Sequence, residues 1–245
     1  MPARGESIVL LALFVAPVVW GQVLPPEVSV ARHAGGNGYD VSVTNLANSP
    51  ITALFMQGAG TLPGGRQRWI LVEKDYAFLP DEQPIKAGEK RVLRAAESPE
   101  LKVALFSDGT AAGDPEWIAA VRKRRELALE ALNQVIRLVD QVRAHPQDQR
   151  DAVQRLKALE AAMLTRAQAQ PPGQQGPALQ GLDSFQARII YGGVARELER
   201  EGDPGKTTVA LEDRLLAVRR TYLGLQQRVT GMAPELSSAA QPPAR

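Results

Sequence analysis

Residues 101–143, LKVALFSDGTAAGDPEWIAAVRKRRELALEALNQVIRLVDQVR, combine a strand-like half with a helical half, and this change decides the fold class. Residues 103–106 form a short apolar run of strand formers, closed by the turn pair Asp108-Gly109. Asp114 then offers a capping acceptor, followed by a proline where no amide hydrogen is needed and by an acid in the first turn. The stretch therefore predicts a β region followed by a helical region.

The helical half carries apolar side chains at alternating steps of three and four residues, which places them on one face of a helix. We expect the helix to end near Ala144, because the following His145-Pro146 disfavours helical geometry. At 1.5 Å per residue the helix is roughly 43 Å long, so one small sheet cannot cover it and it needs helical partners. We call this apolar face of the helix the seam, and Arg125 alone interrupts it. We expect the Arg125 side chain to reach the rim of the interface between helices or to pair with a carboxylate from another helix. The predicted seam comprises Ile118, Val121, Ala128, Leu129, Leu132, Val135, Ile136, Val139 and Val142.

The chain opens with a continuous apolar run at residues 8–20, IVLLALFVAPVVW. A membrane-spanning helix needs about 20 apolar residues, so this shorter run predicts a cleaved secretory signal over residues 1–21 and a mature start near Gln22. An uncleaved anchor is the alternative, because Glu6 weakens the basic flank of the run. We therefore expect a secreted or periplasmic protein, with no stable membrane anchor after cleavage.

The composition narrows the function classes. The chain has 245 residues, 44% hydrophobic and 23% charged, which is typical of globular proteins and allows two modest domains. The absence of cysteine excludes disulfides, a lipoprotein anchor and a thiol nucleophile. A net charge of +2 and 5% aromatic residues do not favour a nucleic-acid partner. With only two histidines, the sequence also predicts no cofactor or multi-histidine metal centre.

The first part of the chain alternates short apolar runs with turn residues. Residues 33–38, HAGGNG, contain the Asn-Gly pair of a tight hairpin. Ile51, Ala53 and Phe55 recur at every second position, so we expect them to share one face of a strand. Together with the run at 103–106, this gives about seven strands in some eighty residues. That density is typical of an immunoglobulin-like sandwich, which we place over residues 22–113.

Three stretches carry a family resemblance. VSVTNLANSPITAL at 41–54 and PIKAGEKRVL at 84–93 resemble the strand-turn-strand pattern of immunoglobulin-like and fibronectin-like sandwiches in secreted bacterial proteins. VALFSDGTAAGDPEW at 103–117, ahead of a long helix, is similar to a group of uncharacterised secreted proteins. The motifs are turns and core positions, so the resemblance implies a fold and no activity. The sequence departs from antibody-type domains in lacking their buried disulfide.

Residues 114–231 are expected to form about four helices packed as an antiparallel bundle. The Pro/Gln/Gly stretch at 169–181 predicts a flexible connection, and 232–245 a disordered tail. Gly192-Gly193 costs roughly 1 kcal/mol per glycine in a helix, so it marks a kink, a close helix crossing or a break. The faces predicted after the first helix are Ala152, Leu156, Leu159 and Met163; Phe185, Ile189, Ile190, Val194 and Leu198; and Leu211, Leu215, Val218, Tyr222, Leu225 and Val229.

Two motifs invite a binding hypothesis. Asp108, Asp114 and Glu116 could hold a calcium ion between the two halves, although their spacing differs from the helix-loop-helix calcium motif. The alternative is that these acids serve as turn and cap residues. GDPGKTT at 202–208 matches the end of a phosphate loop, but the motif requires a glycine where Arg200 stands and a strand before it. A helix stop followed by a helix start is therefore preferred there.

Arg122, Lys123, Arg124 and Arg125 form the one dense basic run. On a helix these side chains point in four directions, and Arg122 has Glu126 one turn on. The main interpretation is a solvated helix face. The alternative is an interaction surface for an acidic polymer, a membrane surface or a protein partner.

Catalytic candidates are few, because His33 and His145 have no recognisable catalytic neighbour. The leading prediction is an exported, non-enzymatic binding or structural module with a protein partner or self-association. One alternative is a hydrolase-like enzyme with a site at the junction of the two halves, near Asp108, Asp114 and Trp117. Another is a helical scaffold that self-assembles through its seams. Convergent acids in a junction pocket would favour the enzyme, and an uncovered apolar stripe would favour assembly or a partner.

Overall fold

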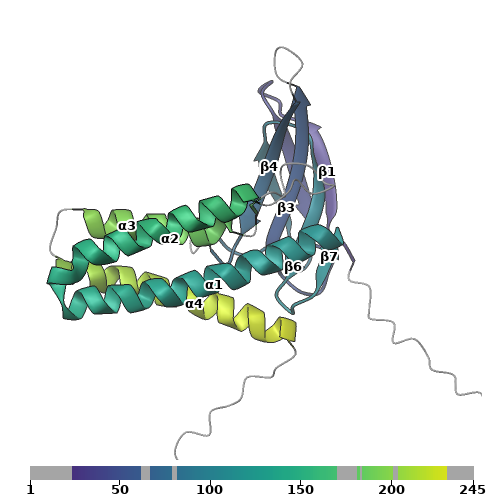
Figure 1. Ribbon diagram of the computed structural model, residues 1–245. Helices are drawn as coiled ribbons and strands as arrows, with labels where there is room; N and C mark the ends of the chain where they lie inside the picture. The colour runs from purple at the N-terminus through teal and green to yellow at the C-terminus, as the bar shows by residue number, and fades with distance from the viewer. Residues whose placement is uncertain are drawn as a thin grey trace, which may run out of the picture.

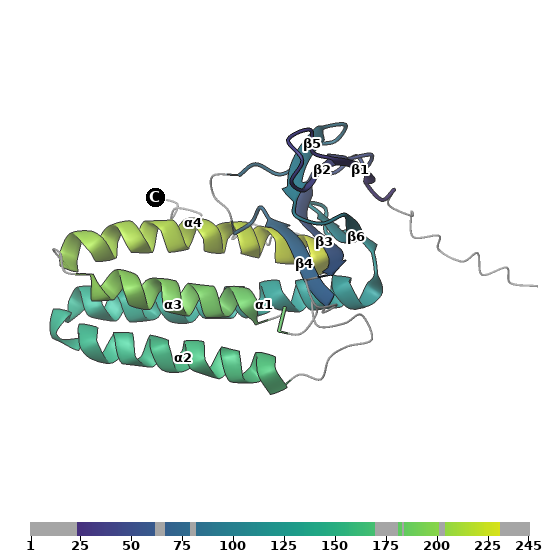
Figure 2. The ribbon, with the colours of Figure 1, turned by 90° about the horizontal axis from the view of Figure 1, so that it is seen from above.

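The computed structural model describes residues 24–61, 67–78, 82–169, 181–182, 184–200 and 204–230, which form two antiparallel sheets followed by four helices (Figure 1). The helices extend to one side of the sheets (Figures 1 and 2). The α+β class predicted from the sequence is confirmed. The predicted secretory signal at 1–21, the tail at 232–245 and most of the connection at 169–181 lie outside the described residues.

One sheet has the strand order β1-β2-β5 and the other β4-β3-β6-β7, and all neighbouring strands are antiparallel. The hairpin predicted around Asn37-Gly38 joins β1 to β2, through six residues rather than two. The strands are β1 Glu27–Arg32, β2 Tyr39–Thr44, β3 Ile51–Thr61, β4 Gln67–Asp75, β5 Lys90–Ala95, β6 Pro99–Phe106 and β7 Ala111–Gly113.

The two sheets share a hydrophobic core. Val41 and Val43 of β2 contribute to it from the three-stranded sheet, and Leu54 and Met56 of β3 from the four-stranded sheet. All four side chains are completely buried. Ser42, which lies between Val41 and Val43 on β2, is polar and half-buried. This alternation is expected of a sheet with one solvated face.

Strand β3 is buried on both faces over residues 51–58. Leu54 and Met56 face the core between the sheets, whereas Ala53 and Phe55 belong to a separate cluster with the first helix. Ile51 lies in the core between the sheets, because the pairing of β3 with β6 shifts register between Ile51 and Ala53. The prediction that Ile51, Ala53 and Phe55 share one face is therefore wrong for Ile51.

Helix α1, Pro115–Ala144, has the bounds predicted from the sequence. The side chain of Asp114 caps it by accepting a hydrogen bond of 2.9 Å from the amide of Glu116. Its first turns lie on the outer face of the four-stranded sheet, where Trp117 and Val121 are completely buried beside Phe55. The junction between the sheets and the helices is thus a packed interface.

Three further helices follow: α2 Gln149–Ala169, α3 Phe185–Glu199 and α4 Pro204–Thr230, with a 3₁₀ turn, η1 Pro146–Asp148, after α1. Helix α1 runs away from the sheets, α2 returns, α3 runs away and α4 returns (Figures 1 and 2). Helix α3 packs on both α1 and α2, and α4 packs mainly on α1. Helix α4 ends beside the sheets, where Arg228 donates a 2.8 Å hydrogen bond to the carbonyl of Ser107.

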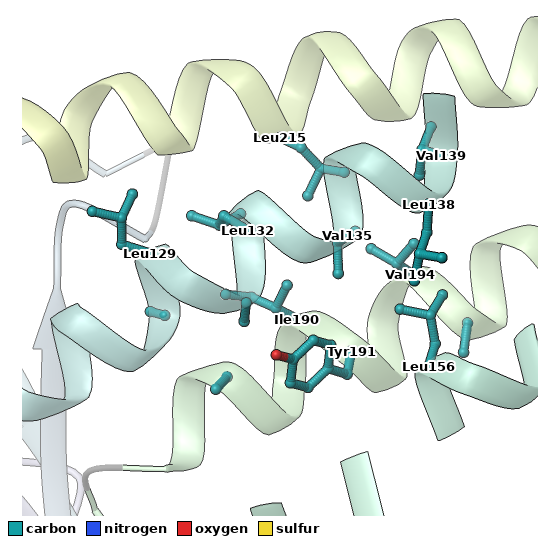
Figure 3. Packing of buried hydrophobic residues seen from close by; sticks show 14 of the residues in the cluster. Leu129, Leu132, Val135, Leu138, Val139, Leu156, Ile190, Tyr191, Val194 and Leu215 are labelled. Atoms are coloured by element: carbon teal, nitrogen blue, oxygen red, sulfur yellow. The ribbon is translucent and has the colours of Figure 1, made fainter. Parts of the chain in front are cut away.

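The four helices share one hydrophobic cluster, which includes Leu132 and Val139 of α1 and Leu215 of α4 (Figure 3). The apolar faces predicted for α1 and α4 therefore meet inside a single chain, where they are covered. The face predicted for α3 is wrong at Ile189, which is 38% exposed; Tyr191 turns inward instead. The side chain of Val229 lies outside the described residues.

Helix α3 runs through Gly192-Gly193 without a break. Gly192 is buried where α3 packs on α2, and a Cβ at this position would collide with the carboxylate of Glu160. Gly193 has open space around it. A kink and a break are thus not seen, and Gly192 lies where α3 crosses α2, with the flexible end of Glu160 in the space that a Cβ would take.

Candidate functional site

The end of strand β4 places a carboxylate between the sheets and the helices. The side chain of Asp75 is completely buried, and Arg125 of α1 donates to it from Nη2 at 3.0 Å and from Nε at 3.3 Å. Gln186 of α3 donates from Nε2 at 3.2 Å, and the amide of Ala77 donates at 3.2 Å. A buried carboxylate is stable when it has an opposing cation and further donors, and Asp75 has both.

The same network reaches two more elements. The hydroxyl of Tyr222, on α4, donates a 2.8 Å hydrogen bond to Oε1 of Gln186. Burial, reinforced by the carboxylate of Asp75, raises the pKa of Tyr222 well above its usual value, so the hydroxyl stays protonated as a donor. Arg125 also donates to the carbonyl of Thr52 on β3 at 3.0 Å. The hydrogen-bond network around Asp75 thus ties together β3, β4, α1, α3 and α4.

Arg124 is a second buried cation at the junction, with 1% of its surface exposed. Its guanidinium lies 5.2 Å from the ring centre of Phe55 and 5.1 Å from that of Phe185, and it forms an ion pair with Glu73. Two aromatic faces and a carboxylate therefore stabilise the charge. The Nε and Nη1 atoms of Arg124 have no hydrogen-bond partner in the described part of the chain.

The interpretation of residues 122–125 as a solvated helix face is wrong for Arg124, because the sheet lies against this turn of α1. Arg125 pairs with a carboxylate, as its seam position predicts, but the carboxylate comes from a strand and not from a helix. Arg122 donates to the carbonyl of Gly109 at 3.1 Å. Lys123 is exposed and pairs with Glu126 at 2.8 Å. The four side chains therefore form no common interaction surface.

A cavity of about 70 Å³ opens beside this network, between the β6–β7 turn, α1 and α4. Leu105 and Leu225 supply apolar walls, and Glu126 is the one acid among its described lining residues. Arg125, which also lines the cavity, is already bonded to Asp75. The convergent acids that would favour a hydrolase are not assembled at this cavity.

The acids proposed for a metal ion have structural partners instead. Asp108 accepts hydrogen bonds from the amide and the hydroxyl of Thr110, at 2.9 and 2.6 Å, and so closes the β6–β7 turn. Asp114 caps α1, and Glu116 is exposed in its first turn. Across the described residues, no three His, Asp or Glu side chains lie close enough to hold a metal ion. The structure therefore does not bring these three acids together as ligands.

Two grooves run along the helical half. The first, of about 190 Å³, lies between α3 and α4; Ile190 and Leu215 line it, together with Phe78 from the segment after β4. The second, of about 630 Å³, lies between α1 and α2 and is lined by both apolar and cationic side chains. Sequence reasoning missed both grooves, because periodicity shows which face of a helix is apolar but not how far neighbouring helices diverge.

No helix in the described ranges is long and apolar enough to span a membrane. Comparison with protein-family models, with curated proteins and with solved structures finds no match. The function is therefore inferred from the buried groups and open surfaces of the chain.

Proposed function

We propose that this protein is an exported, non-enzymatic binding module that holds another protein on its helical half. The contrast between the junction and the helices carries the proposal. At the junction the carboxylate of Asp75 is bonded to Arg125 and Gln186, whereas the helical half keeps two open grooves. Groups that satisfy one another stabilise a fold, and open grooves lined in part by apolar side chains suit a protein partner.

We propose an immunoglobulin-like sandwich for the two sheets. The strand order supports it: in immunoglobulin notation β1, β2 and β5 take the places of strands A, B and E, and β4, β3, β6 and β7 those of C′, C, F and G. Trp117 and Val121 of α1 cover the outer face of the second sheet, so that face is not open to a partner. Strand β1 of the first sheet remains exposed, and we propose the helices as the main contact surface because the open grooves lie there.

The proposed antiparallel bundle and the proposed export have separate support. The alternating helix directions in Figures 1 and 2 suit an up-down-up-down bundle. The apolar run at residues 8–20 supports export. A chain exported without cysteine depends on its cores and on the junction network for stability.

The proposal is tested by placing a photo-crosslinking side chain at single positions of the full-length protein in its native host. Ile189 marks the groove between α3 and α4, Arg155 marks the groove between α1 and α2, and Ser29, exposed on β1, is the control. We expect one polypeptide to be captured from a groove position and not from Ser29. Capture from none of the positions, or equally from all three, would overturn the proposal. A band at twice the chain mass would overturn it in favour of self-association.

A further inference from the structure

The groove between α1 and α2 has a regular helical lining. Helix α1 contributes Gln134, Arg137, Leu138 and Gln141, whose spacing of three, one and three residues places them on one face. Helix α2 contributes Arg155, Ala158 and Leu159 at the matching spacing. Helix α2 packs mainly on α3 and contacts α1 much less (Figure 2), so a groove remains between α1 and α2.

The base of this groove is apolar. Leu138 is buried at the edge of the shared helical cluster, and Leu159 packs against the same cluster while half-buried. Ala158 is exposed beside Leu159 and is small enough to let another backbone approach. An apolar stripe at helical spacing along an open groove suits the apolar face of an additional helix.

The walls of the groove are cationic. Arg137 on α1 and Arg155 on α2 are both exposed, and neither forms an ion pair or a hydrogen bond with a described residue. Some other cations of the helical half are neutralised: Arg143 pairs with Asp140 at 3.0 Å, and Lys157 pairs with Glu199. The two free guanidinium groups thus face one groove from opposite sides.

Two acids near the ends of the groove have hydrogen-bond partners of their own. Glu130 accepts a hydrogen bond from Gln134 at 3.4 Å, and Asp148 accepts one from Gln141 at 3.0 Å. No Asp or Glu is among the described lining residues. Asp151 is exposed one helical turn before Arg155 but forms no ion pair with it, so neither Arg137 nor Arg155 is paired with a described carboxylate.

We infer that the groove between α1 and α2 binds an amphipathic, acidic helix of another protein. Apolar side chains of that helix pack on Leu138 and Leu159, and its carboxylates pair with Arg137 and Arg155 in bidentate contacts. The inference rests on the proposed function and names the chemistry of the partner.

Two other occupants fit less well. Within the described residues, the large exposed apolar side chains of the helices are Leu164, Ile189 and Val209, one to a helix, so a second copy offers no apolar stripe to insert. A nucleic acid would use aromatic side chains for stacking, and the described lining contains none. A helix with an apolar face and carboxylates complements both the base and the walls.

The test uses the full-length protein and labelled synthetic helical peptides about 20 residues long, since shorter isolated helices are marginal. The first peptide has leucines along one face and glutamates beside them. The second has the same composition with leucines distributed around the helix, and the third has lysine in place of every glutamate. We expect saturable binding of the first peptide only, measured by fluorescence anisotropy, weakening as salt is raised. Equal binding of the second or third peptide, no binding of the first, or tighter binding of a single-stranded oligonucleotide would overturn the inference.

Variants locate the binding. Arg137→Glu with Arg155→Glu should weaken binding of the first peptide at least about tenfold, because like charges then face its carboxylates. The matched control, Arg196→Glu with Arg220→Glu, makes the same change in charge at exposed positions of α3 and α4 and should change affinity by less than about twofold. An equal loss in both variants would overturn the groove assignment.

Failure of these peptides is distinguishable from failure of the proposed function. A polypeptide captured from Ile189 but not from Arg155 would leave the binding module intact and remove the groove between α1 and α2 as its site. Capture of no polypeptide from either position would remove the binding module itself.

Discussion

Arg125 of α1 and Asp75 of β4 stand 50 positions apart in the chain and are joined by two hydrogen bonds, of 3.0 and 3.3 Å. Both side chains are withdrawn from water: 11% of the arginine side chain and none of the aspartate side chain is exposed. Each charge therefore depends on the other, and removing one leaves its partner buried and uncompensated.

Asp75→Asn should lower the free energy of unfolding by about 3 to 5 kcal/mol, because Arg125 then lacks its counter-charge. Reversible urea unfolding of the full chain measures the change. The control is Glu126→Gln, which removes the exposed ion pair with Lys123 and should cost at most about 1 kcal/mol. A loss at Asp75 no larger than that at Glu126 would show that the junction pair contributes little.

The shared core of the helices predicts a cost for truncation. Leu132→Ala and Leu215→Ala should each lower the free energy of unfolding by about 2 to 5 kcal/mol, since both side chains are buried in the same cluster. Leu164, at 41% exposed, is the matched control, and Leu164→Ala should change stability by about 0.5 kcal/mol or less. Equal effects at Leu132 and Leu164 would contradict the packing.

The two adjacent glycines of α3 should respond differently to alanine. Gly193→Ala should raise the free energy of unfolding by about 0.5 to 1 kcal/mol, because it restores helix propensity where space is open. Gly192→Ala should gain less, because its Cβ displaces the carboxylate of Glu160. Thermal unfolding of the two variants side by side checks the order, and a larger gain at Gly192 would contradict the close crossing.

Alkaline pH should destabilise the fold through Tyr191. Burial, and secondarily the charge of Glu130, raises the pKa of Tyr191 from 10.0 to about 12. The folded state therefore keeps this proton while the unfolded state loses it, so the contribution is complete below about pH 10 and is lost as pH rises toward about 12. Urea unfolding as a function of pH measures the slope, and Tyr191→Phe should make it shallower. An unchanged slope would assign the alkaline loss to other groups.

Local sequence rules predicted the features that short segments specify. The bounds of α1 followed from Asp114 at its start and His145-Pro146 at its end, and its buried face followed from apolar spacing. These features depend on residues within a few positions of one another, so the sequence displays them directly.

Features that depend on distant partners were not predicted. The burial of Arg124 requires the sheet beneath α1, and the inward turn of Ile51 requires the register shift between β3 and β6. The sequence held a partial signal of the buried network at Arg125, because a cation on an apolar seam requires a carboxylate partner. Gln186 is a second such signal, since it is a polar side chain on a buried helical face. Neither signal identifies Asp75, because the sequence does not show which acid the fold brings to them.

Strand β3, with apolar side chains on both faces, makes α1 a third layer over the sheets. A fragment holding only the strands would expose Phe55 to water and leave Asp75 without its guanidinium partner. We therefore expect that neither half folds independently of the other. Recombination that exchanged one half for an unrelated segment would break this layer, and a change at Asp75 would require a compensating change at Arg125. We therefore expect the two halves to have been inherited together and to have diverged in step.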